Sequence, residues 1–187
     1  QNAVLENFQY SDDRSQMVAL HKAIEYVEAF TPNSGKKLLF YGDVGVGKSH
    51  LAISIHKEVI AKGFSSIYIE VEKILRIIKD TWSNNSDSTE NEFFQVLQEV
   101  DLLVIDDLGV EQKTDWVQEK LFSILNSRLG KNTIITTNFT PIEIADKYNN
   151  RISDRILDRL EVEDCIEIEV KTSYRKKKLL ENLMKQK

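Results

Sequence analysis

The sequence has little cysteine, no excess of positive charge and no long hydrophobic segment, and each absence narrows the class of protein. Cys165 is the only cysteine in 187 residues, which excludes an internal disulfide and a zinc site built from cysteines. The formal net charge of −5 gives no overall positive field that would attract nucleic acid. No apolar run approaches the roughly 18 residues of a membrane-spanning helix, and the sequence has no signal peptide. We therefore expect a soluble, cytoplasmic protein without a membrane partner.

The length and the apolar pattern predict a single α/β domain with a large core. Short apolar runs of β-rich composition alternate with segments in which apolar residues recur at helical spacing, as in a parallel sheet covered by helices. The candidate strands span residues 38–41, 66–71, 101–105, 133–137 and 165–170. Because the chain begins at Gln1 rather than at methionine, we expect it to be part of a longer protein.

A glycine-rich loop follows the first candidate strand. Residues 42–49, GDVGVGKS, match the pattern G-x-x-x-x-G-K-[ST] of a phosphate-binding loop. Glycine lets the backbone bring successive N–H groups close to phosphate oxygens, and the helix that begins near Lys48 directs its positive end to the same anion. Lys48 would reach the β- and γ-phosphates of ATP, and the Ser49 hydroxyl would bind Mg²⁺. The alternative, a glycine turn that matches by chance, is disfavoured by the flanking strand and helix. The expected nucleotide contacts are Gly42, Asp43, Val44, Gly45, Val46, Gly47, Lys48, Ser49 and His50.

Polar residues follow two other candidate strands. Asp106 and Asp107 come directly after the apolar run 101–105, at the carboxyl end of a strand, where open α/β sheets bind their ligands. Asp106 would hold Mg²⁺ through the coordination shell of the ion, and Asp107 would orient or polarise the attacking water. Asn138 ends the run 133–137 and could position the same water. The alternative for the aspartate pair is a helix N-cap or a turn.

Two predicted helices carry basic residues at regular spacing. Lys73, Arg76 and Lys79 lie on one face of the segment 72–82, and two interpretations remain open: a solvated surface or a contact with a phosphate backbone. A later helix has an arginine face beside an apolar one. Its arginines are Arg151, Arg155 and Arg159, and its apolar residues are Ile152, Ile156 and Leu160. In the first predicted helix, the residues expected to face inward are Met17, Leu20, Ile24, Val27 and Phe30.

Taken together, these motifs resemble the AAA+ ATPases, and more narrowly the ATPase domain of bacterial and phage replicative helicase loaders of the DnaC/DnaI type. The resemblance covers roughly residues 8–175. The residues that carry it are 103–109 (LVIDDLG), Glu111, Thr114, Trp116, Val117, Arg128, 136–139 (TTNF), 151–156 (RISDRI) and 173–175 (SYR). ATPases of the IstB type, which assist transposition, share the same motifs.

The resemblance implies a three-layer αβα P-loop NTPase fold with a five-stranded parallel sheet and a reduced C-terminal lid. It divides the chain into an N-terminal linker and helix (1–36), an ATPase core (37–170) and a C-terminal helix (171–187). It implies that Asn138 is the sensor 1 residue, that Arg175 is the sensor 2 contact with the nucleotide, and that Arg155 is an arginine finger offered to a neighbouring subunit. Arg151 fits the arginine-rich box as well, so the choice between the two stays open.

The function that the resemblance implies is ATP hydrolysis, with Mg²⁺, by a loader that delivers a replicative DNA helicase onto single-stranded DNA when replication begins. The partners would be that helicase, single-stranded DNA and further copies of the same chain. Alternatives are an IstB-like transposition helper, a small-molecule kinase, and an ATP-gated DNA-binding adaptor that hydrolyses little. Asp107 replaces the glutamate common in AAA+ proteins, which would slow hydrolysis.

Overall fold

A five-stranded parallel sheet lies at the centre of the computed structural model, which describes residues 3–8, 14–83, 87–170 and 183–184. Its strands are β1 (Lys37–Tyr41), β2 (Ser66–Glu70), β3 (Leu102–Leu108), β4 (Asn132–Thr137) and β5 (Cys165–Glu167). They are arranged in the order β2-β3-β4-β1-β5, and every neighbouring pair is parallel. The predicted five-stranded parallel sheet is therefore confirmed.

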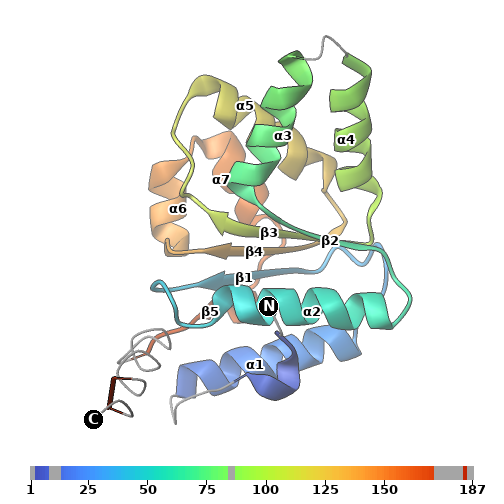
Figure 1. Cartoon of the computed structure of the whole chain (residues 1–187). Coiled ribbons are helices and arrows are strands. Elements are labelled where there is room, and N and C mark those ends of the chain that lie inside the picture. Colours follow the sequence, from blue (N-terminus) through green and yellow to red (C-terminus); the bar gives the residue numbers. More distant parts are fainter. Residues whose placement is uncertain (1–2, 9–13, 84–86, 171–182, 185–187) are drawn as a thin grey trace.

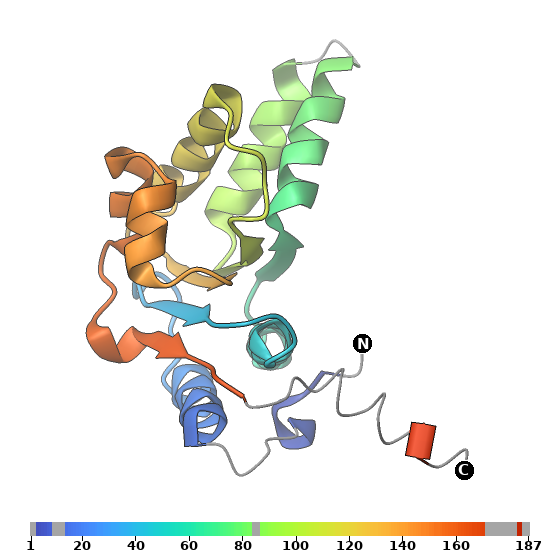
Figure 2. The same ribbon diagram turned by 90° about the vertical axis from the view of Figure 1, so that its left-hand side faces the viewer.

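Helices cover both faces of the sheet (Figure 1). One face carries α1 (Arg14–Glu28) and α2 (Lys48–Ala61), and the short 3-10 helix η1 (Leu5–Asn7) lies beside them (Figure 2). The helices on the other face are α3 (Val71–Ser83), α4 (Asp87–Glu99), α5 (Asp115–Ser127), α6 (Pro141–Lys147) and α7 (Asn150–Leu157). A second 3-10 helix, η2 (Val162–Asp164), precedes β5. The predicted three-layer αβα arrangement is confirmed, and no helix in the described part of the chain is long and apolar enough to cross a membrane.

The strands are apolar on both sides because each side packs against helices. Side chains alternate along β1: Leu38 and Phe40 join the core cluster under α1 and α2, whereas Leu39 joins the cluster under α3–α7. In β3, Val104 and Ile105 divide between the same two clusters, and both are fully buried. Burial of one such side chain contributes about 1.5–3 kcal/mol. The two cores fix the register of the sheet and hence the positions of the residues at its carboxyl edge.

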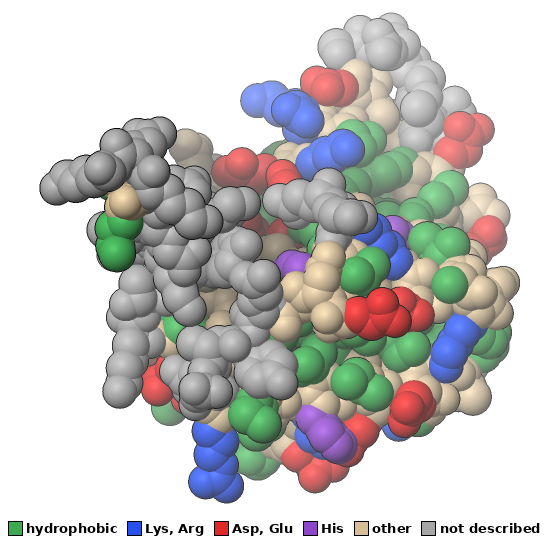
Figure 3. All heavy atoms as spheres, turned by 60° about the horizontal axis from the view of Figure 1, so that its bottom comes forward, with side chains coloured by type: hydrophobic (Ala, Val, Ile, Leu, Met, Phe, Trp, Pro, Cys, Tyr) green, Lys and Arg blue, Asp and Glu red, His purple; other side chains and the backbone are tan. Residues whose placement is uncertain are grey.

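The buried face of α1 differs in part from the predicted one. Val27 is buried as predicted, but Met17 and Ile24 are 51% and 39% exposed, whereas Ala19 and Ala23 are fully buried. The helix packs close to α2, and the small alanines allow this approach, so a pattern read from the largest apolar residues misplaces Met17 and Ile24. Hydrophobic side chains consequently lie among charged ones on this side of the molecule (Figure 3).

Two other predicted boundaries change. α7 ends at Leu157, so Arg159 and Leu160 are not part of the arginine helix, and Arg159 has a left-handed φ of 60°. β5 ends at Glu167 rather than at residue 170. The predicted C-terminal helix 171–187 lies outside the described residues apart from Leu183 and Met184, which are exposed.

Candidate nucleotide-binding site

The glycine loop connects the carboxyl end of β1 with the first turn of α2. Gly42, Gly45 and Gly47 have φ values of 131°, 81° and 113°, a region that favours glycine. At Gly42 the need is steric as well, because a Cβ there would lie 2.2 Å from the carbonyl oxygen of Ile168. The loop therefore takes a shape that other residues would not permit at these positions, and its last glycine directly precedes the helix.

Lys48 is held at the centre of this loop. Its side chain is only 5% exposed, and Nζ donates to the carbonyl oxygens of Gly42 and Asp43, each at 2.8 Å. The third acceptor is Oδ1 of Asn138 at 2.7 Å, from the tip of β4. Burial lowers the pKa of Lys48, and the nearby carboxylates of Asp107, Asp106 and Asp43 oppose that shift. The structure thus brings together a buried cation and three oxygen ligands that a phosphate oxygen could replace.

Asp106 is the most enclosed carboxylate beside the loop, with 2% exposure. Its Oδ1 accepts a hydrogen bond from the hydroxyl of Thr136 on β4, and its Oδ2 accepts one from the hydroxyl of Tyr68 on β2. Burying a charge is costly unless it is hydrogen-bonded, and these two donors meet that need. Sequence reasoning missed both donors, since only the strand register brings them to Asp106.

Asp107 has a different environment although it is the next residue. It is only partly buried, and its backbone adopts a left-handed φ of 54°, at an irregularity in the pairing of β3 with β4. Its N–H donates to Oγ1 of Thr136 at 2.9 Å. Asparagine and aspartate are the non-glycine residues that most often take this conformation. The two neighbouring aspartates thus differ in burial and in backbone conformation.

Phe8 and Gln16, near the N-terminus, contact the glycine loop on the side of the sheet that α1 and α2 cover. The ring of Phe8 lies against Gly47, where an added Cβ would come within 2.7 Å of it, and makes an edge contact with His50. Nε2 of Gln16 donates to the carbonyl oxygen of Val46 at 3.0 Å. Neither Phe8 nor Gln16 was predicted as a site residue, because neither belongs to a recognisable motif.

A pocket of about 600 Å³ opens beside the loop, between the carboxyl ends of β1, β4 and β5. Gly42, Asp43 and Asn138 are part of its lining, and this volume is typical of a small-molecule site. Among the described residues, no three His, Cys, Asp or Glu side chains gather into a metal cluster. Ser49 and Asp106 do not line this pocket but lie at the loop beside it. A divalent ion at the loop would be shared between these two residues and phosphate oxygens, as is usual for Mg²⁺. These donors fit a magnesium ion bound together with a triphosphate.

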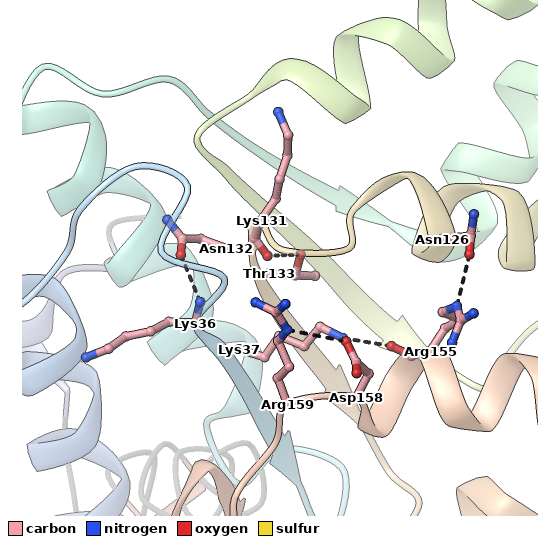
Figure 4. Close-up of polar contacts among 9 residues, drawn as sticks. All are labelled: Lys36, Lys37, Asn126, Lys131, Asn132, Thr133, Arg155, Asp158 and Arg159. Carbon is pink, nitrogen blue, oxygen red and sulfur yellow. Dashed lines mark hydrogen bonds and ion pairs between the residues drawn. The ribbon is translucent and has the colours of Figure 1, made fainter.

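Arg155 lies beside Lys37 and Asn126 (Figure 4). Its carbonyl oxygen accepts a hydrogen bond of 2.8 Å from Nζ of Lys37, the first residue of β1, and its Nε donates to Asn126 on α5 at 3.0 Å. The glycine loop follows the other end of β1, about 13 Å away at the usual rise per residue. Arg151 lies one turn along α7, with its guanidinium 4.2 Å from the ring of Phe122.

The remaining predicted residues lie apart from the loop or outside the described part of the chain. Lys73, Arg76 and Lys79 are exposed on α3, while Ile74 and Ile78 on the same helix are fully buried. These three cations, called the α3 stripe below, thus lie on the outward face of an amphipathic helix. Arg175 lies outside the described residues.

Residues 1–182 match the model of a protein family described as IstB-like ATP binding protein. The chain belongs to the IstB-like ATP-binding family. The replicative helicase loader DnaC of Escherichia coli (strain K12) is 35% identical over 158 residues, which cover 83% of this chain and 63% of DnaC. The chain therefore spans less than two thirds of the length of that relative.

Solved structures agree with this family. A crystal structure of the DnaC helicase loader superposes with a TM-score of 0.79 and 28% identity, covering 90% of this chain and 97% of that one. The replication initiator DnaA, solved with AMPPCP and single-stranded DNA, gives a TM-score of 0.75 and 26% identity over 98% of this chain and 55% of DnaA. The AAA+ P-loop fold expected for the IstB-like domain is confirmed.

Proposed function

We propose that this IstB-like domain is the ATPase module of a replicative helicase loader. The observation that carries the proposal is the buried ammonium of Lys48, which lies within hydrogen-bonding distance of both the glycine loop and Asn138, with Asp106 and Asp107 beside it. This is the arrangement that phosphoryl transfer requires, since its catalysis depends on positioning and on charge stabilisation. The 35% identity to the DnaC loader supports the biological role.

Each residue at the loop has a distinct task in this proposal. The N–H groups of residues 42–49 and the first turn of α2 bind phosphate oxygens, and Lys48 neutralises the charge that develops there. Ser49 and Asp106 hold Mg²⁺, which supplies electrophilic stabilisation to the phosphates when bound. Asp107 orients the attacking water, and Asn138 contacts the γ-phosphate or that water.

The contrast between the two aspartates supports this division. Asp106 is enclosed and fixed by two hydroxyl donors, which suits a group that holds an ion in one geometry. Asp107 is only partly buried and has a left-handed backbone conformation, so its carboxylate is accessible to a water molecule. A general base needs access to the proton that it accepts.

Arg155 acts on a neighbouring subunit in this proposal. It lies at the end of the sheet opposite to the glycine loop, so it cannot complete its own site without a large rearrangement. A head-to-tail contact between copies would place the amino end of one sheet against the loop of the next. Arg151 remains the alternative finger, and Arg175 is proposed as the sensor 2 contact.

The proposed partners are a replicative helicase and single-stranded DNA. The structural relatives include a DnaC helicase loader and a DnaA bound to single-stranded DNA. On this chain, the exposed cations Lys73, Arg76 and Lys79 of α3 are the proposed DNA contact.

A transposition helper is the second candidate, because the matching family is described by the name IstB. Co-purification separates the two: the full-length protein is mixed with a purified replicative helicase, or with a transposase, with ATP or without nucleotide. The loader proposal predicts ATP-dependent capture of the helicase. Capture of the transposase alone would contradict the loader proposal. A small-molecule kinase is excluded if the protein converts ATP to ADP and free phosphate without phosphorylating another molecule.

A further inference from the structure

The carboxylate of Asp106 accepts a hydrogen bond from a hydroxyl group on each neighbouring strand, β2 and β4. In the register of the sheet, Tyr68 on β2 lies opposite Val104, two residues before Asp106 on β3. Val104 packs into the core under α1 and α2, so Asp106, at the alternate position, faces the same side of the sheet. That is the side covered by α2, whose first turn carries Ser49. Tyr68 therefore reaches Asp106 diagonally, on the face where the nucleotide site is built.

Thr136 reaches the same carboxylate from the opposite side. It follows Ile134 at the alternate position on β4, and Ile134 belongs to the same core cluster as Val104. The two hydroxyls donate to different oxygens, Tyr68 to Oδ2 and Thr136 to Oδ1. A carboxylate that accepts one hydrogen bond on each oxygen keeps further lone pairs for other ligands, but it can no longer rotate freely. These two hydrogen bonds, which together form the clamp on Asp106, fix the plane of the carboxylate. The carboxylate keeps its ability to bind an ion.

The two donors differ in how many contacts depend on them. Thr136 also accepts the N–H of Asp107 at 2.9 Å, so its hydroxyl supports the backbone of the turn as well. The Tyr68 hydroxyl has Asp106 as its one hydrogen-bond partner in the described part of the chain. Removal of the Tyr68 hydroxyl is therefore the cleaner perturbation of the Asp106 carboxylate.

The surroundings restrain the ring of Tyr68. It packs near the imidazole of His56, with 6.3 Å between centroids, and that imidazole is itself held by Ser66 through Nδ1 at 2.7 Å. The ring is therefore held where its hydroxyl donates to Asp106.

We propose that Tyr68 is a positioning residue for the magnesium site, which holds the Asp106 carboxylate in the orientation that binds the ion. This inference rests on the proposed function, because it assumes that Asp106 and Ser49 hold Mg²⁺ beside a bound nucleotide. Partners that orient metal ligands in this way typically change metal affinity about 10–100-fold when they are removed.

The test compares Tyr68→Phe with Tyr26→Phe in the full-length protein. Tyr26 lies on α1, where its hydroxyl donates to the carbonyl oxygen of Lys36 at 3.4 Å, so the control also loses one phenol hydroxyl, away from the loop. Binding of a fluorescent ADP derivative is measured across a Mg²⁺ titration and in EDTA. Tyr68→Phe should weaken the apparent Mg²⁺ affinity about 10-fold and leave nucleotide affinity in EDTA unchanged. Tyr26→Phe should match the parent in both.

A double-mutant cycle separates positioning from a general effect on stability. If Tyr68 acts through Asp106, Tyr68→Phe should have no further effect on Mg²⁺ affinity in an Asp106→Asn background. Equal Mg²⁺ dependence in Tyr68→Phe and the parent, or the same additional loss in both backgrounds, overturns the inference while the proposed function stands. A parent protein that binds the ADP derivative equally with and without Mg²⁺ contradicts both.

Discussion

The ammonium of Lys48 lies 2.7 Å from the amide oxygen of Asn138, although 90 residues separate the two in sequence. The contact joins the glycine loop after β1 to the tip of β4, its neighbour in the sheet. A phosphate oxygen bound by Lys48 is therefore also within reach of Asn138. In the proposed ATPase, this pair links phosphate binding to the residue that senses the terminal phosphate.

Replacement of Asp106 and replacement of Asp107 should impair different steps, ion binding in the first case and hydrolysis in the second. Asp107→Asn should bind Mg²⁺-nucleotide like the parent but hydrolyse ATP about 100-fold more slowly or worse, because orientation of the water by a carboxylate is lost. Asp106→Asn should in addition bind Mg²⁺ more weakly, so that its nucleotide binding responds only at higher Mg²⁺ concentrations. Equilibrium binding and single-turnover hydrolysis of both variants check this. Equal losses of binding in the two would contradict the separate roles.

Arg155 can be tested by mixing two inactive proteins. Arg155→Ala keeps its glycine loop and should lose about 1,000-fold in turnover, the usual contribution of an arginine finger, while its ATP binding changes little. Lys48→Ala keeps its arginine. Mixing the two should restore activity in a concentration-dependent way if the site is shared between subunits.

Arg151→Ala, mixed with Lys48→Ala in the same way, shows which arginine is the finger. Both guanidinium groups lie over the ring of Phe122, that of Arg151 at 4.2 Å and that of Arg155 at 5.9 Å from the centroid. Arg155 also donates to Asn126, so its replacement disturbs that contact in addition. If neither mixture regains activity although the proteins demonstrably assemble, the shared site is refuted.

The α3 stripe should contribute to DNA affinity without regard to sequence. Replacement of Lys73, Arg76 and Lys79 by Gln should weaken binding to every single-stranded oligonucleotide. The log-log salt slope should flatten by about 0.7 for each phosphate that the variant no longer neutralises. Fluorescence anisotropy across a salt series measures both quantities.

A charge-matched control distinguishes direct binding from net charge. Lys36, Lys113 and Lys131 lie outside α3, and their replacement by Gln removes the same charge. Affinity and slope should stay closer to the parent in this control. Identical losses of affinity in the two triple variants would indicate that the α3 stripe is a solvated surface and makes no direct contact with DNA.

Arg128 should be important for stability. It is 1% exposed, and its guanidinium donates to the carbonyl oxygens of Leu97, Gln98 and Val100 at the end of α4 and to that of Asn132 on β4. Burial lowers the pKa of Arg128 to about 10, so the group is still charged at neutral pH. Arg128→Met should leave these acceptors without their donor and lower the free energy of unfolding by about 2–4 kcal/mol.

Urea denaturation measures this loss, and Arg76→Met on the exposed side of α3 is the control, expected within about 0.5 kcal/mol of the parent. An Arg128→Met protein as stable as this control would show that the carbonyl contacts contribute little. An unchanged urea dependence of the unfolding free energy would confirm that the unfolded states are comparable.

Local motifs made part of this structure predictable. The glycine loop, the apolar strand that leads to Asp106 and the amphipathic helix α3 each depend on residues that are close in sequence, so pattern and propensity identify them. The clamp on Asp106 depends on the register of three strands, and no local pattern contains that information. The prediction that Met17 and Ile24 face inward was wrong because Ala19 and Ala23, which make the close packing of α1 possible, carry little weight in a hydrophobic pattern.

The position of Arg155 shows the same limit. Its spacing from Arg151 predicted a helical face, and both do lie on α7. Its bond to Lys37, 118 residues away, fixes it at the amino end of the sheet, and only the folded topology gives that relation. The assignment of Arg155 as a finger stays a prediction.

The most direct test of the account is ATP turnover by Lys48→Ala, measured against Lys57→Ala with and without single-stranded DNA. Lys57 lies on the same helix and donates to the carbonyl oxygen of Ala3 at 3.0 Å, away from Asn138. Lys48→Ala should melt close to the parent temperature and lose turnover by about 100-fold or more, because it removes charge that stabilises the transferred phosphoryl group. Lys57→Ala should hydrolyse ATP like the parent. A folded Lys48→Ala protein that hydrolyses ATP at the parent rate would contradict the central claim.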